Sequence, residues 1–171
     1  MTGAQGKLYG IGVGPGDPEL VTLKAARLIA AADVVAFFAK KDRPGHAHRI
    51  AGSHIAEGAT RVRLEYPYTT EIPSDDQRYR DAMTAFYDTA AATLSSHLGQ
   101  GRAVAVLCEG DPFLYGSFIH LIERLSDVPC EVVPGVTAMA GCWSEAATPM
   151  TRAADVLCVL PGTLEEDDLA A

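Results

Sequence analysis

The chain has 171 residues, of which 48% are hydrophobic, and a formal net charge of −8 at pH 7. These values are typical of one ordinary domain, or one domain plus a fragment, and the negative charge argues against nucleic acid or an anionic membrane as partner. No apolar signal region and no apolar stretch of about 18 residues is present, so we expect a soluble chain without a membrane span.

Strand-like and helix-like patterns alternate along the whole chain. Apolar runs and polar–apolar alternation predict strands at 8–13, 34–38, 60–64, 103–107, 130–133 and 156–160. Apolar residues at helical spacing predict helices at 18–32, 47–56, 118–125 and 137–147, and a long helix between the loop 65–77 and residue 98. The alternation predicts the α/β class with a doubly wound parallel sheet.

Ligands of such sheets bind outside the carboxyl ends of the strands. Five segments directly follow predicted strands and should meet at one site: 12–17, 39–49, 65–71, 108–117 and 134–138. The four cysteines are far apart and include no Cys-x-x-Cys pair, which favours reduced thiols in a cytoplasmic protein over a zinc site. No metal site is expected.

The segment 10–25 is the most informative, because glycines at alternate positions run into a helix start. Asp17 is a suitable N-cap and Pro18 a suitable first helical residue. The glycines would let another molecule approach the backbone closely. A P-loop would need Lys-Ser or Lys-Thr after its last glycine, and the glycine spacing does not fit a Rossmann fingerprint. An acidic cap also repels phosphate, so the turn favours a ligand without phosphates, or a cationic one.

Four segments in order resemble the tetrapyrrole methylase family, whose members transfer a methyl group from S-adenosylmethionine to a corrin or porphyrin precursor. They are 10–25 (Gly-x-Gly-Pro-Gly-Asp with Leu-x-Thr-Leu-Lys-Ala), 109–117 (Glu-Gly-Asp-Pro-Phe-Leu-Tyr-Gly-Ser), 133–138 (Val-Pro-Gly-Val-Thr-Ala) and 159–164 (Val-Leu-Pro-Gly-Thr-Leu). The resemblance implies two α/β domains with the methyl donor in the cleft between them, and a homodimer for the full-length form.

On this resemblance, residues 1–125 form an N-terminal domain with the acceptor site and part of the donor site, and residues 128–171 begin an incomplete second α/β domain. We therefore expect weak donor binding by this chain alone, and its activity stays open. A catalytically inactive binding domain is one alternative.

The resemblance also implies the roles of particular residues. Donor contacts would come from Pro15, Gly16, Glu109, Gly110, Asp111, Thr137 and Ala138. Asp17 would face the acceptor and assist proton transfer as the catalytic residue. Ordinary structural roles remain open at each place: a helix cap at Asp17, a strand–helix turn at 109–112 and an N-cap at Thr137.

A basic stretch follows the second predicted strand. Because a precorrin carries eight carboxylates, the substrate class implies a role in acceptor binding for Lys40, Lys41, Arg43 and Arg49, whereas a solvated charged loop is the alternative. Tyr66 in the next loop could stack on a flat macrocycle or anchor the loop to the core.

Within the family, Glu109-Gly110-Asp111-Pro112 and Tyr115-Gly116-Ser117 resemble the branch that methylates precorrin-2 at C-20. Uroporphyrinogen methylases typically carry Gly-Gly-Asp-Pro and Phe-Gly-Arg there. The implied reaction is attack by an electron-rich meso carbon on a sulfonium methyl group, helped mainly by positioning. Another tetrapyrrole methylase or a related diphthine synthase would share the donor and differ in the acceptor, and cobalt-free and cobalt-bearing acceptors are not distinguished.

Overall fold

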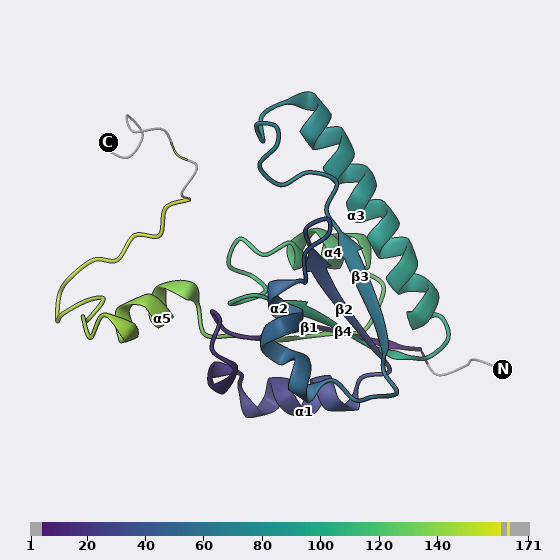
Figure 1. Ribbon diagram of the computed structural model, residues 1–171, viewed down its shortest axis with the longest axis horizontal. Helices are drawn as coiled ribbons and strands as arrows, with labels where there is room; N and C mark the ends of the chain where they lie inside the picture. The colour runs from purple at the N-terminus through teal and green to yellow at the C-terminus, as the bar shows by residue number, and fades with distance from the viewer. Residues whose placement is uncertain (1–4, 162–163, 165–171) are drawn as a thin grey trace. The chain divides into compact units, whose positions relative to one another are not determined.

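A five-stranded parallel sheet forms the centre of the fold in the computed structural model, which describes residues 5–161 and 164 (Figure 1). The strand order is β3-β2-β4-β1-β5. The strands are β1 (Lys7–Gly12), β2 (Val34–Ala39), β3 (Thr60–Glu65), β4 (Ala103–Cys108) and β5 (Cys130–Val133). The expected α/β class and parallel sheet are confirmed, and β3 lies at an edge, as its alternating pattern indicates.

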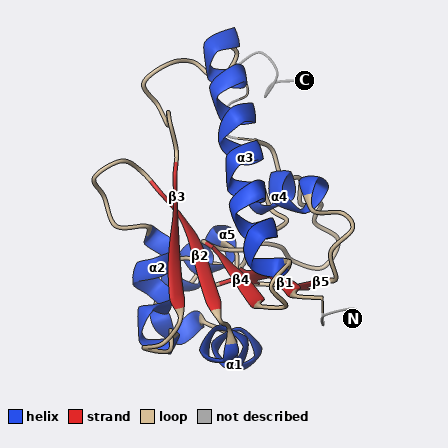
Figure 2. Cartoon of the chain, turned by 90° about the vertical axis from the view of Figure 1, so that its right-hand side faces the viewer, coloured by secondary structure: helices blue, strands red, loops and turns tan. Residues whose placement is uncertain are grey.

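Helices cover both faces of this sheet (Figure 2). One face packs against α1 (Leu23–Ala31) and α2 (His46–Ala51), and the other against α3 (Gln77–Leu98) and α4 (Phe118–Arg124). Side chains of β2 alternate between the two layers, with Val35 packed on the first and Val34 on the second. Because both faces are covered, β2 and β4 are apolar throughout.

The helix expected at 18–32 is divided in the structure. A 3-10 turn, Pro18–Leu20, comes first, and α1 begins only at Leu23. Each piece has its own cap: Asp17 Oδ1 accepts from the Glu19 N–H at 2.8 Å, and Thr22 Oγ1 accepts from the Ala25 N–H at 3.1 Å. The second cap requires extended backbone at Thr22, which interrupts the helix. Similarly, α2 ends at Ala51 and a 3-10 turn, Gly52–His54, follows.

The division into compact units differs from the expected start of a second domain near residue 128. β5 pairs with β1 over Leu8–Cys130 to Ile11–Val133 and therefore belongs to the first sheet. The first unit extends to Ala138, and a second unit begins at Met139 with most of α5 (Ala138–Glu145).

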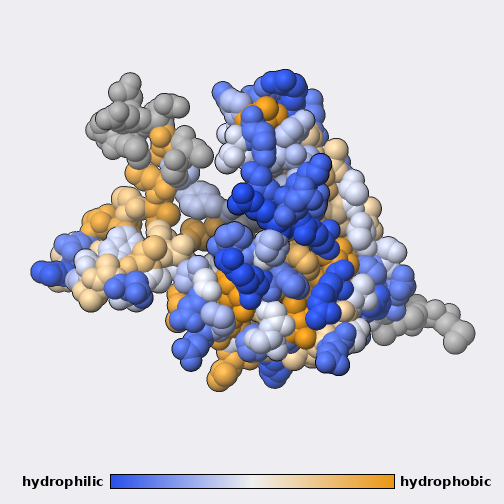
Figure 3. All heavy atoms as spheres, viewed as in Figure 1, coloured by the Kyte–Doolittle hydropathy of each residue, from blue (hydrophilic) through white to orange (hydrophobic). Residues whose placement is uncertain are grey.

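The strand expected at 156–160 was wrong, because those residues form no strand. A strand needs a neighbour for its backbone hydrogen bonds, and none is paired with this segment within the described residues. Its apolar side chains are exposed, which Figure 3 shows as an orange run beside the grey atoms. In the motif at 159–164, residues 162 and 163 lie outside the described part of the chain.

Candidate active site

The expected donor loops meet at the carboxyl ends of β4, β1 and β5. The Val13 N–H donates to Cys108 O at 2.9 Å, and the Gly110 N–H donates to Gly14 O at 2.8 Å. A further hydrogen bond joins the third loop, because the Gly135 N–H donates to Asp111 Oδ2 at 3.1 Å. Segments more than a hundred positions apart in the sequence are therefore joined into one surface.

Glycines are required here because the loops touch each other. A Cβ added at Gly135 would lie 2.0 Å from Gly110 O, and one added at Gly12 would lie 2.5 Å from Gly135 N. Gly110 has a φ of 65°, a left-handed conformation that favours glycine. The sequence-based interpretation, that the glycines of the first loop admit a ligand, therefore does not apply to Gly12. It still fits Gly16, where an added Cβ would meet nothing within 4 Å.

Both carboxylate oxygens of Asp111 are engaged with backbone groups. Oδ1 accepts from the Phe113 N–H at 2.8 Å, and Oδ2 accepts from the Gly135 N–H. The side chain thus fixes the shape of its own turn and ties the turn to the loop after β5. This structural function was not recognised in the sequence, where no spacing rule links residue 111 to residue 135.

The remaining expected donor and catalytic residues border this surface. An added Cβ at Gly110 would lie 3.9 Å from Ala138 N, so the segment that carries Thr137 and Ala138 passes close to this turn. Pro15 is half-buried, whereas Gly16 and Asp17 are exposed. Asp17 caps the 3-10 turn with one oxygen, so its structural role as a cap is established, although not as the cap of α1.

A cleft of about 370 Å³ lies next to the donor loops, at the carboxyl ends of β2, β3 and β4. Glu109 connects the two places, because it lines the cleft and directly precedes Gly110. The residues that line it with charged or hydroxyl groups are Lys40, Arg43, His46, Tyr66, Thr69, Glu109, Tyr115 and Ser117. Of the expected acceptor residues, Lys40, Arg43 and Tyr66 come together here, while Lys41 and Arg49 are exposed and do not line the cleft.

Lys40 is already paired with a carboxylate that the sequence did not single out. Its Nζ lies 3.0 Å from Glu71 Oε1. Glu71 also accepts from the N–H groups of Thr69 at 2.6 Å and Thr70 at 2.9 Å. The Thr69 N–H and the Lys40 ammonium hold the pKa of Glu71 at about 2, well below its ordinary value. Glu71 therefore shapes the loop after β3 and fixes Lys40 at the mouth of the cleft.

The other charges of the cleft differ in their pairing. The Arg43 guanidinium makes no ion pair with any part of the chain that the structure describes. His46 Nδ1 lies 3.7 Å from Glu109 Oε1, an ion pair when the imidazole is protonated. Arg43 is thus the guanidinium most available to an anionic ligand.

Tyr66 both anchors its loop and lines the cleft. Its ring stacks on Phe38, with centroids 5.4 Å apart, and its hydroxyl lies 2.6 Å from Ser117 Oγ. The Tyr87 hydroxyl donates to the same Ser117 oxygen at 3.0 Å. Ser117 and Tyr87 had no sequence signal for this role, since they lie 51 and 30 positions from their hydroxyl partners.

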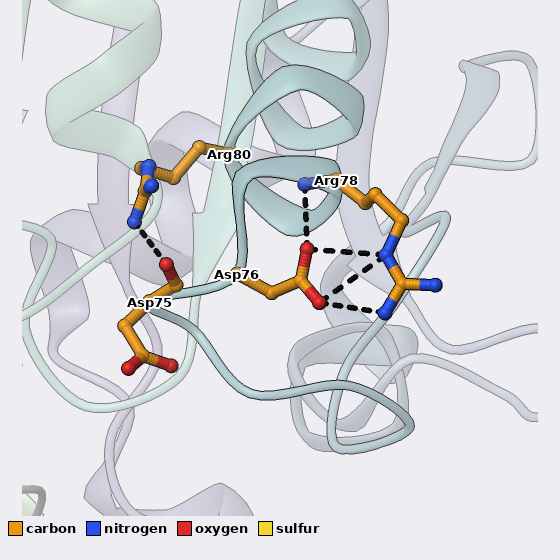
Figure 4. A network of polar contacts seen from close by, with 4 residues as sticks. All are labelled: Asp75, Asp76, Arg78 and Arg80. Atoms are coloured by element: carbon orange, nitrogen blue, oxygen red, sulfur yellow. Dashed lines mark hydrogen bonds and ion pairs between the residues drawn. The ribbon is translucent and has the colours of Figure 1, made fainter.

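The start of α3 holds the far end of the loop that carries Tyr66 and Glu71 (Figure 4). Asp76 accepts from the Arg78 N–H at 2.8 Å and from the Arg78 guanidinium at 2.6 Å. These hydrogen bonds lower the pKa of Asp76 to about 2. Arg80 donates to the carbonyl oxygen of Asp75. The loop is therefore fixed at both ends by charged groups.

Within residues 5–161 and 164, no group of three or more potential ligand side chains could hold a metal ion. None of the described helices combines the length and apolar character that crossing a membrane requires.

Comparison with known proteins gives consistent matches. The family profile described as Tetrapyrrole (Corrin/Porphyrin) Methylases matches residues 7–171. A precorrin-2 C(20)-methyltransferase from Sinorhizobium sp is 48% identical over 96% of this chain. The cobalamin biosynthesis protein CobIJ from Mycobacterium bovis is 44% identical over 97% of it. A solved uroporphyrin-III C-methyltransferase from Thermus thermophilus, complexed with S-adenosyl homocysteine, has a TM-score of 0.56 and 27% identity over 86% of this chain.

The chain is shorter than each of these proteins. The match spans 67% of the Sinorhizobium enzyme, 33% of the Mycobacterium protein and 51% of the Thermus chain.

Proposed function

The chain belongs to the tetrapyrrole (corrin/porphyrin) methylase family, and from this premise we propose that it serves an S-adenosylmethionine-dependent methyltransferase that acts on precorrin-2 at C-20. The observation that carries the proposal is the convergence of three glycine-rich loops beside a cleft with cationic side chains. The 48% identity to a precorrin-2 C(20)-methyltransferase supports this acceptor over uroporphyrinogen.

The donor-binding part of the proposal rests on the loops after β1, β4 and β5. S-adenosylmethionine supplies an activated sulfonium methyl group when bound. Pro15, Gly16, 109–111, Thr137 and Ala138 would hold it mainly through backbone groups, because the side chain of Asp111 is occupied within the protein. Since these loops are hydrogen-bonded to one another, their geometry is set before the donor arrives, which reduces the ordering cost of binding.

The acceptor-binding part rests on the cleft. Arg43 and Lys40 would hold carboxylates of the tetrapyrrole, and Lys41 and Arg49 would add longer-range attraction from the exposed surface. Tyr66 would contact the macrocycle with the ring face that its stacking partners leave free. The chain's own contribution to catalysis would then be to orient the acceptor carbon toward the methyl group, with the Asp17 carboxylate assisting the later loss of a proton.

The direct test is methyl transfer by the chain to precorrin-2 under anaerobic conditions, with a ¹³C-labelled methyl donor. We expect one added methyl group by mass and a label at C-20 by NMR. Uroporphyrinogen III serves as the alternative acceptor in a parallel reaction. Transfer only to uroporphyrinogen III would contradict the acceptor, and donor binding without transfer to either would instead favour the binding-domain alternative.

Two finer points belong to the same proposal. We place the protein in the cytoplasm, because all four cysteines are free thiols, as a reducing compartment maintains them. We also propose that the full-length form is a homodimer, by resemblance to the family. Light scattering during size-exclusion chromatography tests the second point, and a monomer at micromolar concentration would contradict it.

A further inference from the structure

Three hydroxyl groups from distant parts of the chain form a cluster in the wall of the cleft. Tyr66 directly follows β3, Tyr87 lies in α3, and Ser117 directly precedes α4. Ser117 Oγ is the centre of the cluster, 2.6 Å from the Tyr66 hydroxyl and 3.0 Å from the Tyr87 hydroxyl. We call Tyr66, Tyr87 and Ser117 the hydroxyl cluster.

Counting protons shows that the cluster has one donor to spare. Each hydroxyl carries one proton and can both donate and accept. The Tyr87 hydroxyl donates its proton to Ser117 Oγ, and the hydrogen bond between Ser117 and Tyr66 uses one further proton. If Tyr66 donates there, the Ser117 proton is free, and if Ser117 donates, the Tyr66 proton is free. Neither hydroxyl has another hydrogen-bond partner among the residues that the structure describes.

In either arrangement the spare proton is carried by a residue that lines the cleft. Tyr66 and Ser117 both line the cleft, whereas Tyr87 does not. The Tyr66 ring contacts Phe38 and Phe86, at centroid distances of 5.4 and 5.1 Å. Burial raises the pKa of Tyr66 and of Tyr87 above the ordinary value, so both phenols keep their protons at neutral pH. The cluster therefore presents a neutral donor rather than an anion.

The neighbouring charges indicate what this donor would meet. The Arg43 guanidinium lines the same cleft without an internal ion pair in the described part of the chain. A guanidinium and a hydroxyl donor that line the same cleft together suit an anionic oxygen, above all a carboxylate.

We propose that the Tyr66–Ser117 pair donates a hydrogen bond to a carboxylate oxygen of the acceptor and so sets the orientation of the macrocycle in the cleft. This inference rests on the proposed function, because it takes the occupant to be a tetrapyrrole carboxylate. Tyr66 and Ser117 are positioning residues, and Tyr87 only supports Ser117.

Proton counting also defines the test variants. Tyr66→Phe leaves the Ser117 proton free, and Ser117→Ala leaves the Tyr66 proton free, so each single variant keeps one donor in the cleft. Only the double variant Tyr66→Phe/Ser117→Ala removes both donors. Tyr87→Phe is the matched control, because it deletes a hydroxyl of the same cluster but still leaves one spare proton between Tyr66 and Ser117.

Calorimetric titration of the wild-type chain and these variants with precorrin-2, under anaerobic conditions, measures the effect. We expect the double variant to bind at least tenfold more weakly, each single variant to lose less than threefold, and Tyr87→Phe to stay within twofold of the wild type. S-adenosylhomocysteine should bind all five proteins equally. The octamethyl ester of precorrin-2, whose neutral carbonyl oxygens are weaker acceptors, should lose less affinity in the double variant than precorrin-2 does. A merely structural role would instead lower the unfolding temperature and both ligand affinities together.

The outcomes separate this inference from the proposed function. If the double variant binds precorrin-2 with the same affinity as the wild type, this inference is overturned and the proposed function is not. Failure of the wild type to bind precorrin-2 would overturn both. If the alanine variant does not fold, Tyr66→Phe/Ser117→Cys leaves no cavity at residue 117, has only a weak S–H donor and should show the same loss.

Discussion

Gly135→Ala should disturb the donor loops more than any other single methyl group added in this region. The new Cβ would lie 2.0 Å from Gly110 O, 2.9 Å from Gly12 Cα and 3.0 Å from Gly110 C. All three neighbours are backbone atoms, so no side chain can rotate away and the loops after β1, β4 and β5 must separate. Overpacking of this kind costs about 1–3 kcal/mol. For a chain of this size each kcal/mol lowers the unfolding temperature by about 2–4 °C, which gives a decrease of about 2–12 °C.

The assay is thermal unfolding followed by circular dichroism, together with calorimetric titration of S-adenosylhomocysteine. We expect at least tenfold weaker binding, because separated loops lose both contacts to the donor and the preorganisation of the site. Gly52→Ala is the matched control: Gly52 has helical φ and ψ of −56° and −36°, and an added Cβ meets nothing within 4 Å. It should leave binding unchanged and stability equal or slightly higher. Wild-type stability and affinity in Gly135→Ala would refute the argument that loop contact requires this glycine.

Three other predictions concern charged side chains. Asp17→Asn should keep stability, because Asn caps as well as Asp, but lower methyl-transfer turnover at least tenfold, and unchanged turnover would rule out a role for the charge. Lys40→Gln and Arg43→Gln should each lower the affinity for precorrin-2 and the salt dependence of that affinity, without changing the affinity for S-adenosylhomocysteine. Equal losses of affinity for both ligands in titrations would mean that the loop supports the whole fold. Hydrogen bonds from Lys24 and Lys7 hold the pKa of Glu131 at about 2, below the ordinary 4.5, so its stabilising effect is complete above pH 4.5 and is lost as the pH falls toward 2. The unfolding temperature of Glu131→Gln should therefore fall less over that range than that of the wild type, and parallel pH profiles would contradict this.

The sequence was sufficient for the sheet and for the meeting of its loops. Short apolar runs such as 103–107 are typical of strands buried on both faces, and parallel strands bring their carboxyl ends to one edge. The segments after β1, β4 and β5 are therefore predicted to lie together, as the structure shows. The sequence did not reveal the break before α1, because Thr22 competes with Asp17 as a cap and local patterns do not rank two adjacent caps.

The hydrogen-bond and ion-pair partners of individual side chains could not be predicted from the sequence. Glu71 pairs with Lys40, and Asp111 bonds to Gly135, only because separate loops fold against each other. No periodicity relates such positions. The expectation that all of the basic stretch faces one ligand was too simple for the same reason, since Arg43 lines the cleft but Lys41 and Arg49 do not. The roles of the expected donor residues and of Asp17 stay predictions.

The position of β1 in the sheet has a consequence for how the chain folds. β2 and β3 are close in sequence, and Val34 pairs with Thr60. β1 instead lies between β4 and β5, which are synthesised much later: Lys7 pairs with Ala103, and Leu8 pairs with Cys130. During synthesis β1 therefore emerges with both edges unpaired and must wait for most of the chain, a non-local pairing that slows folding and exposes the strand to aggregation. Gly10 and Gly12 lower the β-propensity of that strand. Unpaired β1 is consequently a poor template for pairing with other nascent chains before β4 is synthesised.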